Sequence, residues 1–120
     1  MSHTHVPIEG LSKTTARGNR RATIRYRCAP ATVGKVISTE DQEFQRAWII
    51  DLSRQGIGMQ LTRPVEAGRL LVVLVKSNDG TRTFELSARV MHCNPVPHDE
   101  WYVGCELTAQ LTSEDLDHLL

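Results

Sequence analysis

A short basic segment near the N-terminus carries the side chains best suited to binding an anion. Arg20, Arg21 and Arg25 form an RRxxxR pattern. A guanidinium offers a planar set of donors that matches phosphate and stays charged near neutral pH. The same donors match the O6 and N7 acceptors of guanine, and the flat face can stack on a base. Residues four apart in an extended segment point to the same side, so Arg21 and Arg25 can act as a pair. On charge alone, such a segment is more often a solvated basic linker.

A second polar segment contains Asp51, Ser53 and Gly56 in a DxSxxG pattern, directly after the apolar run 48–50. A carboxylate accepts hydrogen bonds from the N1–H and N2–H₂ groups of guanine, and a serine hydroxyl can donate or accept. Gly56 permits a positive φ and leaves room for a ligand near the backbone. Taken alone, this pattern is more often an ordinary turn, because Asp, Ser and Gly all favour turns for local reasons.

The elements that must position these side chains are mostly strands. Apolar or alternating runs predict strands at 31–37, 44–52, 56–61, 70–75, 84–93 and 101–107. In the fifth run Phe84, Leu86, Ala88 and Val90 face one way, and the alternation can be extended to His92. Turns are expected at 63–68 and 78–80, and a loop at 94–99.

The C-terminal end has a helical pattern instead. Thr112 or Ser113 can cap a helix whose first turn is acidic, and Leu116, Leu119 and Leu120 form its apolar face. Six strands without a long crossover imply an antiparallel sheet, and closing the sheet into a small barrel removes its edges. The sequence therefore predicts an all-β fold, a six-stranded antiparallel β-barrel with a C-terminal α-helix.

Composition and charge limit the classes of function. The 120 residues, 40% of them hydrophobic, suit one domain with one core. Net formal charge is zero, yet residues 13–27 hold six cations and no anion, while residues 99–120 hold six anions and no Lys or Arg. This asymmetry indicates one anion-binding segment and disfavours general binding to nucleic acid. Because there is neither a secretory signal nor an apolar stretch of about 20 residues, we expect a cytoplasmic protein without membrane insertion.

The remaining residue types give no indication of catalysis. Three cysteines without a pairing pattern argue against a disulfide scaffold, and no ligand spacing supports a metal site. Neither a nucleophile with its base nor a phosphate loop is recognisable, so an enzyme is the poorer hypothesis. Trp48 and Trp101 are expected to fill the core, although Trp101 is also placed to reach the rim of a pocket beside the proline-rich loop.

Taken together, the two polar patterns are far more specific. RRxxxR followed about 25 residues later by DxSxxG, in an all-β domain of this length, resembles the PilZ family. Gly58 follows the second motif with the family's usual spacing, and the segment 102–107 resembles a late strand of the family. The resemblance covers residues 20–120, which leaves residues 1–19 as a flexible N-terminal tail.

The resemblance implies the fold, the ligand and the residues that bind it. PilZ domains form a six-stranded barrel with a C-terminal helix and bind cyclic di-GMP, a bacterial second messenger with two guanines and two phosphates; no cofactor is implied. Carried over by position, Arg21 and Arg25 contact phosphates and guanine edges. Asp51 and Ser53 hold the guanine or the arginines from the barrel side, and Gly56 shapes the turn.

The first arginine bears on stoichiometry. Family members with an additional arginine before the motif often bind a stacked ligand dimer, and Arg20 occupies that position. Arg17 and Arg21 also form an RxxxR pattern, and we prefer the Arg21–Arg25 register because the first strand then begins where the family has it. Arg17 and Arg27 remain candidates for assisting contacts.

Two kinds of function remain open at this point. In the first, cyclic di-GMP orders the segment 17–27, and this change alters a surface for a downstream protein partner. In the second, the barrel is a protein-interaction module of the same fold that does not bind nucleotide. Nucleic-acid binding through the basic segment is a weaker third hypothesis, and it predicts a steep salt dependence.

Overall fold

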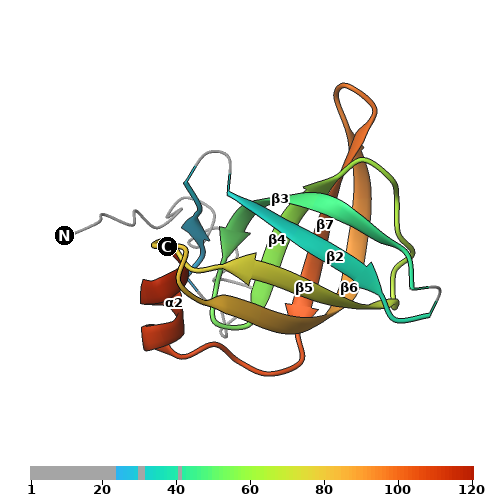
Figure 1. The fold of residues 1–120 in the computed structure, drawn as a ribbon. Coiled ribbons are helices and arrows are strands. Elements are labelled where there is room, and N and C mark those ends of the chain that lie inside the picture. Colours follow the sequence, from blue (N-terminus) through green and yellow to red (C-terminus); the bar gives the residue numbers. More distant parts are fainter. Residues whose placement is uncertain (1–23, 30–31, 41) are drawn as a thin grey trace.

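The computed structural model describes residues 24–29, 32–40 and 42–120. The expected tail, residues 1–19, and the two motif residues Arg20 and Arg21 lie outside this part. Within it the chain forms a closed antiparallel barrel with one helix at its end (Figure 1). The predicted fold is confirmed, and the structure adds one short strand before the barrel.

The elements follow the order expected from the sequence. Their bounds are β1 (Tyr26–Arg27), β2 (Val33–Ser38), β3 (Phe44–Leu52), β4 (Gly56–Leu61), β5 (Leu70–Lys76), β6 (Thr83–Val96), β7 (Glu100–Leu107) and α2 (Ser113–Leu119).

The barrel closes through strand β3. The order along the sheet is β1-β3-β2-β5-β6-β7-β4, and an additional pairing of β3 with β4 joins its two sides. All pairings are antiparallel, as expected for strands joined by short connections. Strand β3 pairs with β2 along its first half, and β1 takes the place of β2 beside Asp51 and Leu52. This arrangement brings the chain that precedes the barrel next to the second polar motif.

Alternation along the strands fills the barrel interior. Leu71, Val73 and Val75 of β5 point inward, and so do Val103, Cys105 and Leu107 of β7. Leu52, Ile57, Met59 and Leu61 are fully enclosed at the β3–β4 side. Only four polar or charged residues are buried in the described part, and two of them belong to the DxSxxG motif: Ser38, Asp51, Ser53 and Ser77.

The C-terminal helix begins as predicted. Thr112 is its N-cap, and its hydroxyl accepts from the Asp115 backbone while the Asp115 carboxylate accepts from the Thr112 backbone. Leu116 and Leu119 are buried. The Asn78 N–H and side-chain amide donate to the His118 and Asp117 carbonyls, which ties α2 to the β5–β6 turn.

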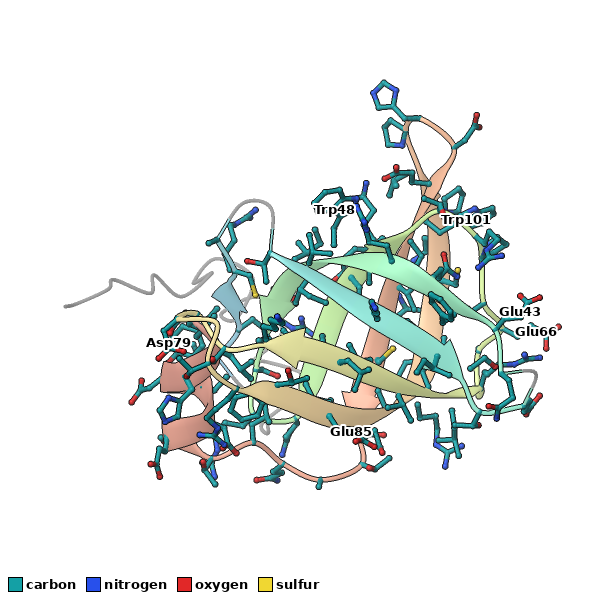
Figure 2. All side chains as sticks on the ribbon, in the orientation of Figure 1. Glu43, Trp48, Glu66, Asp79, Glu85 and Trp101 are labelled. Atoms are coloured by element: carbon teal, nitrogen blue, oxygen red, sulfur yellow. The ribbon has the colours of Figure 1, made fainter. Side chains whose placement is uncertain are left out.

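Two expectations from the sequence need correction. The expected loop 94–99 is half strand, because β6 continues to Val96 and only residues 97–99 turn, with His98 and Asp99 in the left-handed region. Pro95 is tolerated since this hairpin protrudes beyond the barrel (Figure 1) and has no further strand to pair with. Trp48 was expected in the core but lies on the outer face, 36% exposed, because its neighbours Ala47 and Ile49 point inward (Figure 2).

Trp101 is partly buried against the core, as expected. No helix in the described ranges is long and apolar enough to cross a bilayer.

Candidate functional site

The two polar motifs meet at one side of the barrel. Strand β1 pairs Arg27 with Asp51 of β3, which places Arg25 immediately before this pairing. The Arg25 guanidinium donates from Nη1 to Asp51 Oδ1 and forms an ion pair with it. The Arg25 side chain is 34% exposed and that of Asp51 only 10%. Asp51 is therefore a nearly enclosed carboxylate with an arginine across its open side.

A β-bulge in β3 directs Asp51 to this position. The register passes from the Ile49–Met59 pair to the Asp51–Gly58 pair, so Ile50 is an additional residue in β3. Simple alternation from the inward-facing Ile49 would send Asp51 into the interior. The bulge shifts the phase and places Asp51 beside Gly58 on the outer face. The carbonyl of Ile50 accepts from the Cys28 N–H, which fixes the segment after β1 to the bulge.

Ser53 and Gly56 close the tight turn between β3 and β4. The Ser53 N–H donates to the Gly56 carbonyl at 2.9 Å, and the Ser53 hydroxyl accepts from the Gly56 N–H at 3.0 Å and the Gln55 N–H at 3.3 Å. A side chain at Gly56 would meet the Cys105 carbonyl at 3.0 Å and Arg25 Nη2 at 3.4 Å. The missing side chain therefore leaves space for the arginine, and the observed role of Ser53 is to hold the turn.

Two glycines form the floor beside Asp51. Gly58 of β4 pairs with Gly104 of β7, and both lie on the outer face between inward-facing neighbours. Tyr102 lies over Gly58, and its hydroxyl donates to Asp51 Oδ2 at 3.2 Å. A side chain at Gly58 would overlap the Tyr102 hydroxyl and approach Asp51 Oδ1 to 2.8 Å. Gly58 is thus required for the contact between Tyr102 and Asp51.

A second β-bulge, in β6, turns His92 toward the outer face. The β6–β7 register passes from Val90–Cys105 to His92–Gly104, so Met91 is an additional residue and His92 turns outward. This result corrects the extension of the inward alternation to His92. The His92 ring stacks on that of Tyr102 with centroids 6.1 Å apart, and its Nδ1 lies 3.4 Å from the Asn94 amide. Asp51, Tyr102 and His92 therefore form a continuous polar and aromatic row above the two glycines.

The enclosure changes the acid–base behaviour of two neighbouring groups. Burial, together with the Asp51 carboxylate, raises the pKa of Tyr102 from 10.0 to about 12. The same two causes raise the pKa of Cys28 from 9.0 to about 12. Both groups are accordingly protonated near neutral pH, so Tyr102 acts as a donor and Cys28 is an unreactive thiol.

The Tyr102 shift predicts a pH dependence of stability. Since its pKa is raised in the folded chain, the phenol contributes stability in full below pH 10 and loses that contribution as pH rises to about 12. Tyr102→Phe has no proton to lose, so between these two pH values its free energy of unfolding should fall less than that of the unmodified protein. Chemical denaturation at both pH values measures the difference, and equal losses in the two proteins would contradict the assignment.

The structure brings together four of the six predicted site residues. Arg25, Asp51, Ser53 and Gly56 lie at one place on the barrel, whereas Arg20 and Arg21 fall outside the described residues. Tyr102 and His92 were not predicted as site residues. The outward phase of Tyr102, between inward-facing Trp101 and Val103, could have indicated its position; nothing in the sequence marks the bulge that turns His92.

The described residues contain no group of three or more His, Cys, Asp or Glu side chains that could hold a metal ion. The arrangement instead offers an arginine fork, a carboxylate and aromatic rings that pack over two glycines. Such a surface is suited to a planar ligand with hydrogen-bonding edges and negative charge.

Comparison with known proteins agrees with this description. The sequence matches the PilZ domain family over residues 19–120. No curated protein matches it.

Several solved structures share the fold. The PilZ domain of YcgR from Escherichia coli, solved with c-di-GMP, has a TM-score of 0.63 at 15% identity, over 84% of this chain and 86% of that one. The K. pneumonia MrkH–c-di-GMP complex has a TM-score of 0.62 at 14% identity, over 83% of this chain and 49% of that one. The Bacillus subtilis inhibitor of motility MotI/DgrA gives 0.59 at 18% identity, over 84% and 48%. The chain thus spans about half the length of the MotI and MrkH chains.

Proposed function

The chain belongs to the PilZ domain family, a non-catalytic receptor module, and from this premise we propose that it binds cyclic di-GMP beside Asp51. The observation that carries the proposal is the contact between Arg25 and Asp51, which joins two motifs 26 residues apart. Two structures of similar fold were solved with c-di-GMP, which supports the choice of ligand.

In the proposed complex each group has a chemical task. Arg25, with Arg21 from the segment before it, binds phosphate oxygens and the O6 and N7 edge of guanine. Asp51 accepts from the guanine N1–H and N2–H₂ or holds the arginines in place. The missing side chains of Gly56 and Gly58 leave space for Arg25 and for the contact between Tyr102 and Asp51, and Ser53 maintains the turn.

Stoichiometry and output form part of the same proposal. Arg20, the additional arginine before the motif, favours a stacked ligand dimer in the site. Binding orders the part of the segment 17–27 that precedes Arg25, since Arg25 and β1 already contact the barrel, and this changes the surface available to a downstream protein partner. The proposed receptor acts in the cytoplasm and needs no cofactor.

Isothermal titration of the full chain tests ligand choice. We expect saturable binding of cyclic di-GMP at about micromolar affinity or tighter, which needs about 8 kcal/mol. Cyclic di-AMP should bind at least about 100-fold more weakly, because adenine lacks the O6 acceptor and the N1–H and N2–H₂ donors. GTP serves as a control that contains guanine and phosphate but lacks the cyclic dinucleotide backbone. No heat at saturating cyclic di-GMP, or equal affinity for cyclic di-AMP, would exclude the proposed site.

A further inference from the structure

A shallow groove of about 500 Å³ crosses the outer face of the barrel on strands β2, β3 and β5. It lies apart from the Arg25–Asp51 site. Each strand contributes one apolar and one cationic side chain to its lining: Val33 and Lys35, Phe44 and Arg46, Leu74 and Lys76.

Strand register explains how these side chains come together. Lys35 lies in the central strand, opposite Arg46 on β3 and Leu74 on β5. All three point outward because the intervening residues fill the core. The Lys35 ammonium lies 6.0 Å from the centre of the Phe44 ring, so the charge borders an aromatic side chain. The result is an apolar strip with a cationic centre.

The apolar part of the groove is exposed to solvent. Phe44 is 61% exposed and Val33 is 38% exposed. Trp48, which is paired with Val33, extends the exposed surface and points away from the barrel (Figure 2). Neighbouring exposed apolar side chains that include aromatic residues are typical of surfaces that bind another macromolecule.

No ion pair between described residues neutralises the charge of the groove. Among the described residues, the ion pairs of this chain involve Arg25, Arg63 and Arg69, and none involves Lys35, Arg46 or Lys76. The carboxylate nearest in the register is Glu85, opposite Leu74 at the edge of the groove. The groove therefore presents three cations to whatever covers the apolar strip.

We propose that this groove docks an acidic, amphipathic segment of a protein partner, which packs apolar side chains against Val33, Phe44 and Leu74 and places carboxylates on the neighbouring cations Lys35, Arg46 and Lys76. Aromatic and arginine side chains dominate the binding energy of protein interfaces. The aliphatic side chains of Val33 and Leu74 favour a protein segment over a single-stranded nucleic acid. A second copy of this chain docking through the same face would oppose cation to cation, at a cost in free energy.

Outward side chains link the groove to the separate candidate ligand site. Trp48 pairs with Val33 on one side and with Gln60 on the other, and Gln60 pairs with Tyr102, whose hydroxyl donates to Asp51. One row of outward side chains thus leads from the groove to the site. The docking itself does not depend on ligand, so it can be tested separately.

The test uses the full chain and three synthetic peptides of equal length. The first combines Leu and Phe on one side with Glu on the other; the second has Lys in place of Glu; the third has Ala in place of Leu and Phe. We expect the first to bind with a dissociation constant below about 1 mM and to shift the NMR signals of β2, β3 and β5. The other two should bind at least about tenfold more weakly.

Substitutions in the groove test whether the first peptide binds there. Arg46→Glu and Phe44→Ser should each weaken the first peptide about tenfold or more, because they remove a charge contact and the exposed ring. Arg89→Glu and Leu70→Ser likewise reverse an exposed charge and remove an exposed apolar side chain, at positions outside the groove lining, and should leave the affinity unchanged. All four variants should keep the affinity for cyclic di-GMP, which separates this proposal from the function of the ligand site.

Several results would overturn the proposal. They are no binding of the first peptide at about 1 mM, equal binding of the lysine or alanine peptide, or NMR shifts that spare the groove. Sedimentation of the protein alone supplies another: self-association that Phe44→Ser abolishes would assign the groove to a second copy. Binding to anionic vesicles that is lost in Phe44→Ser would assign it to a membrane surface instead.

Discussion

Replacing Arg25 by alanine is expected to weaken cyclic di-GMP binding by about 100-fold or more. A guanidinium can donate two parallel hydrogen bonds to phosphate or to guanine, and each charge-assisted bond contributes about 1.5–3 kcal/mol. The melting temperature of the free domain should hardly change, because Arg25 covers the open side of Asp51, so its removal exposes the carboxylate to water and does not leave it buried without a partner. Asp51 also keeps its hydrogen bond from Tyr102. Titration calorimetry and a thermal melt on the same sample measure the two effects.

Two further variants sharpen this experiment. Arg25→Lys keeps the charge but loses the fork, so its affinity should fall between those of the unmodified protein and Arg25→Ala. Arg89→Ala removes an arginine from β6, where Nη1 donates to the Gly68 carbonyl, and should bind ligand normally. A large fall in melting temperature with unchanged affinity in Arg25→Ala would instead give Arg25 a structural role.

Gly58→Ala is expected to disturb the contact between Tyr102 and Asp51, which lies directly over Gly58. The new methyl group would overlap the Tyr102 hydroxyl and lie 2.8 Å from Asp51 Oδ1, so both side chains must move. Overpacking of this kind costs about 1–3 kcal/mol of stability. Asp51 is then displaced from the position in which it contacts Arg25 and, in the proposed complex, a guanine edge. Affinity for cyclic di-GMP should therefore fall about tenfold or more, equivalent to about 1.4 kcal/mol.

Gly104→Ala is the matched control for Gly58→Ala. The three atoms nearest to its methyl group would all belong to the His92 ring, and because His92 is exposed, the ring can move toward solvent. We therefore expect a smaller loss of stability and of affinity than in Gly58→Ala. Calorimetry and denaturation of both variants make the comparison, and equal effects would show that the Tyr102–Asp51 contact is not what Gly58 protects.

Most of the fold could be predicted from alternation alone. The run 70–75 and the alternating run 101–107 correspond closely to β5 and β7, since one face of each strand is buried. Trp48 was misplaced because residue type was given more weight than phase: inward-facing Ala47 and Ile49 leave no choice for the residue between them. The loop expected at 94–99 was too long, because two prolines obscure a hairpin whose strand continues to Val96 and extends beyond the barrel.

The site was less accessible to such reasoning. Arg25 and Asp51 are far apart in sequence, and only the family resemblance joined them. The bulges at Ile50 and Met91 determine which way Asp51 and His92 point, yet neither position has a residue type that marks a bulge. The outward orientation of Tyr102 could be predicted from the sequence. Its contact with Asp51 could not, because the two residues meet only when the barrel closes.

The two bulges also bear on how this chain should be aligned with others. Ile50 and Met91 are each one residue more than the opposing strand requires. A related chain that has lost either residue would retain a regular ladder with the equivalents of Asp51 and His92 still outside. Deletion of Ile50 or Met91 therefore leaves the orientation of the neighbouring side chains unchanged. Deletion of another residue in β3 or β6 turns the following side chains to the opposite face of the sheet. A sequence alignment without a gap at the bulge would shift the residues on one side of it by one position. Gaps should therefore be permitted first at Ile50 and Met91.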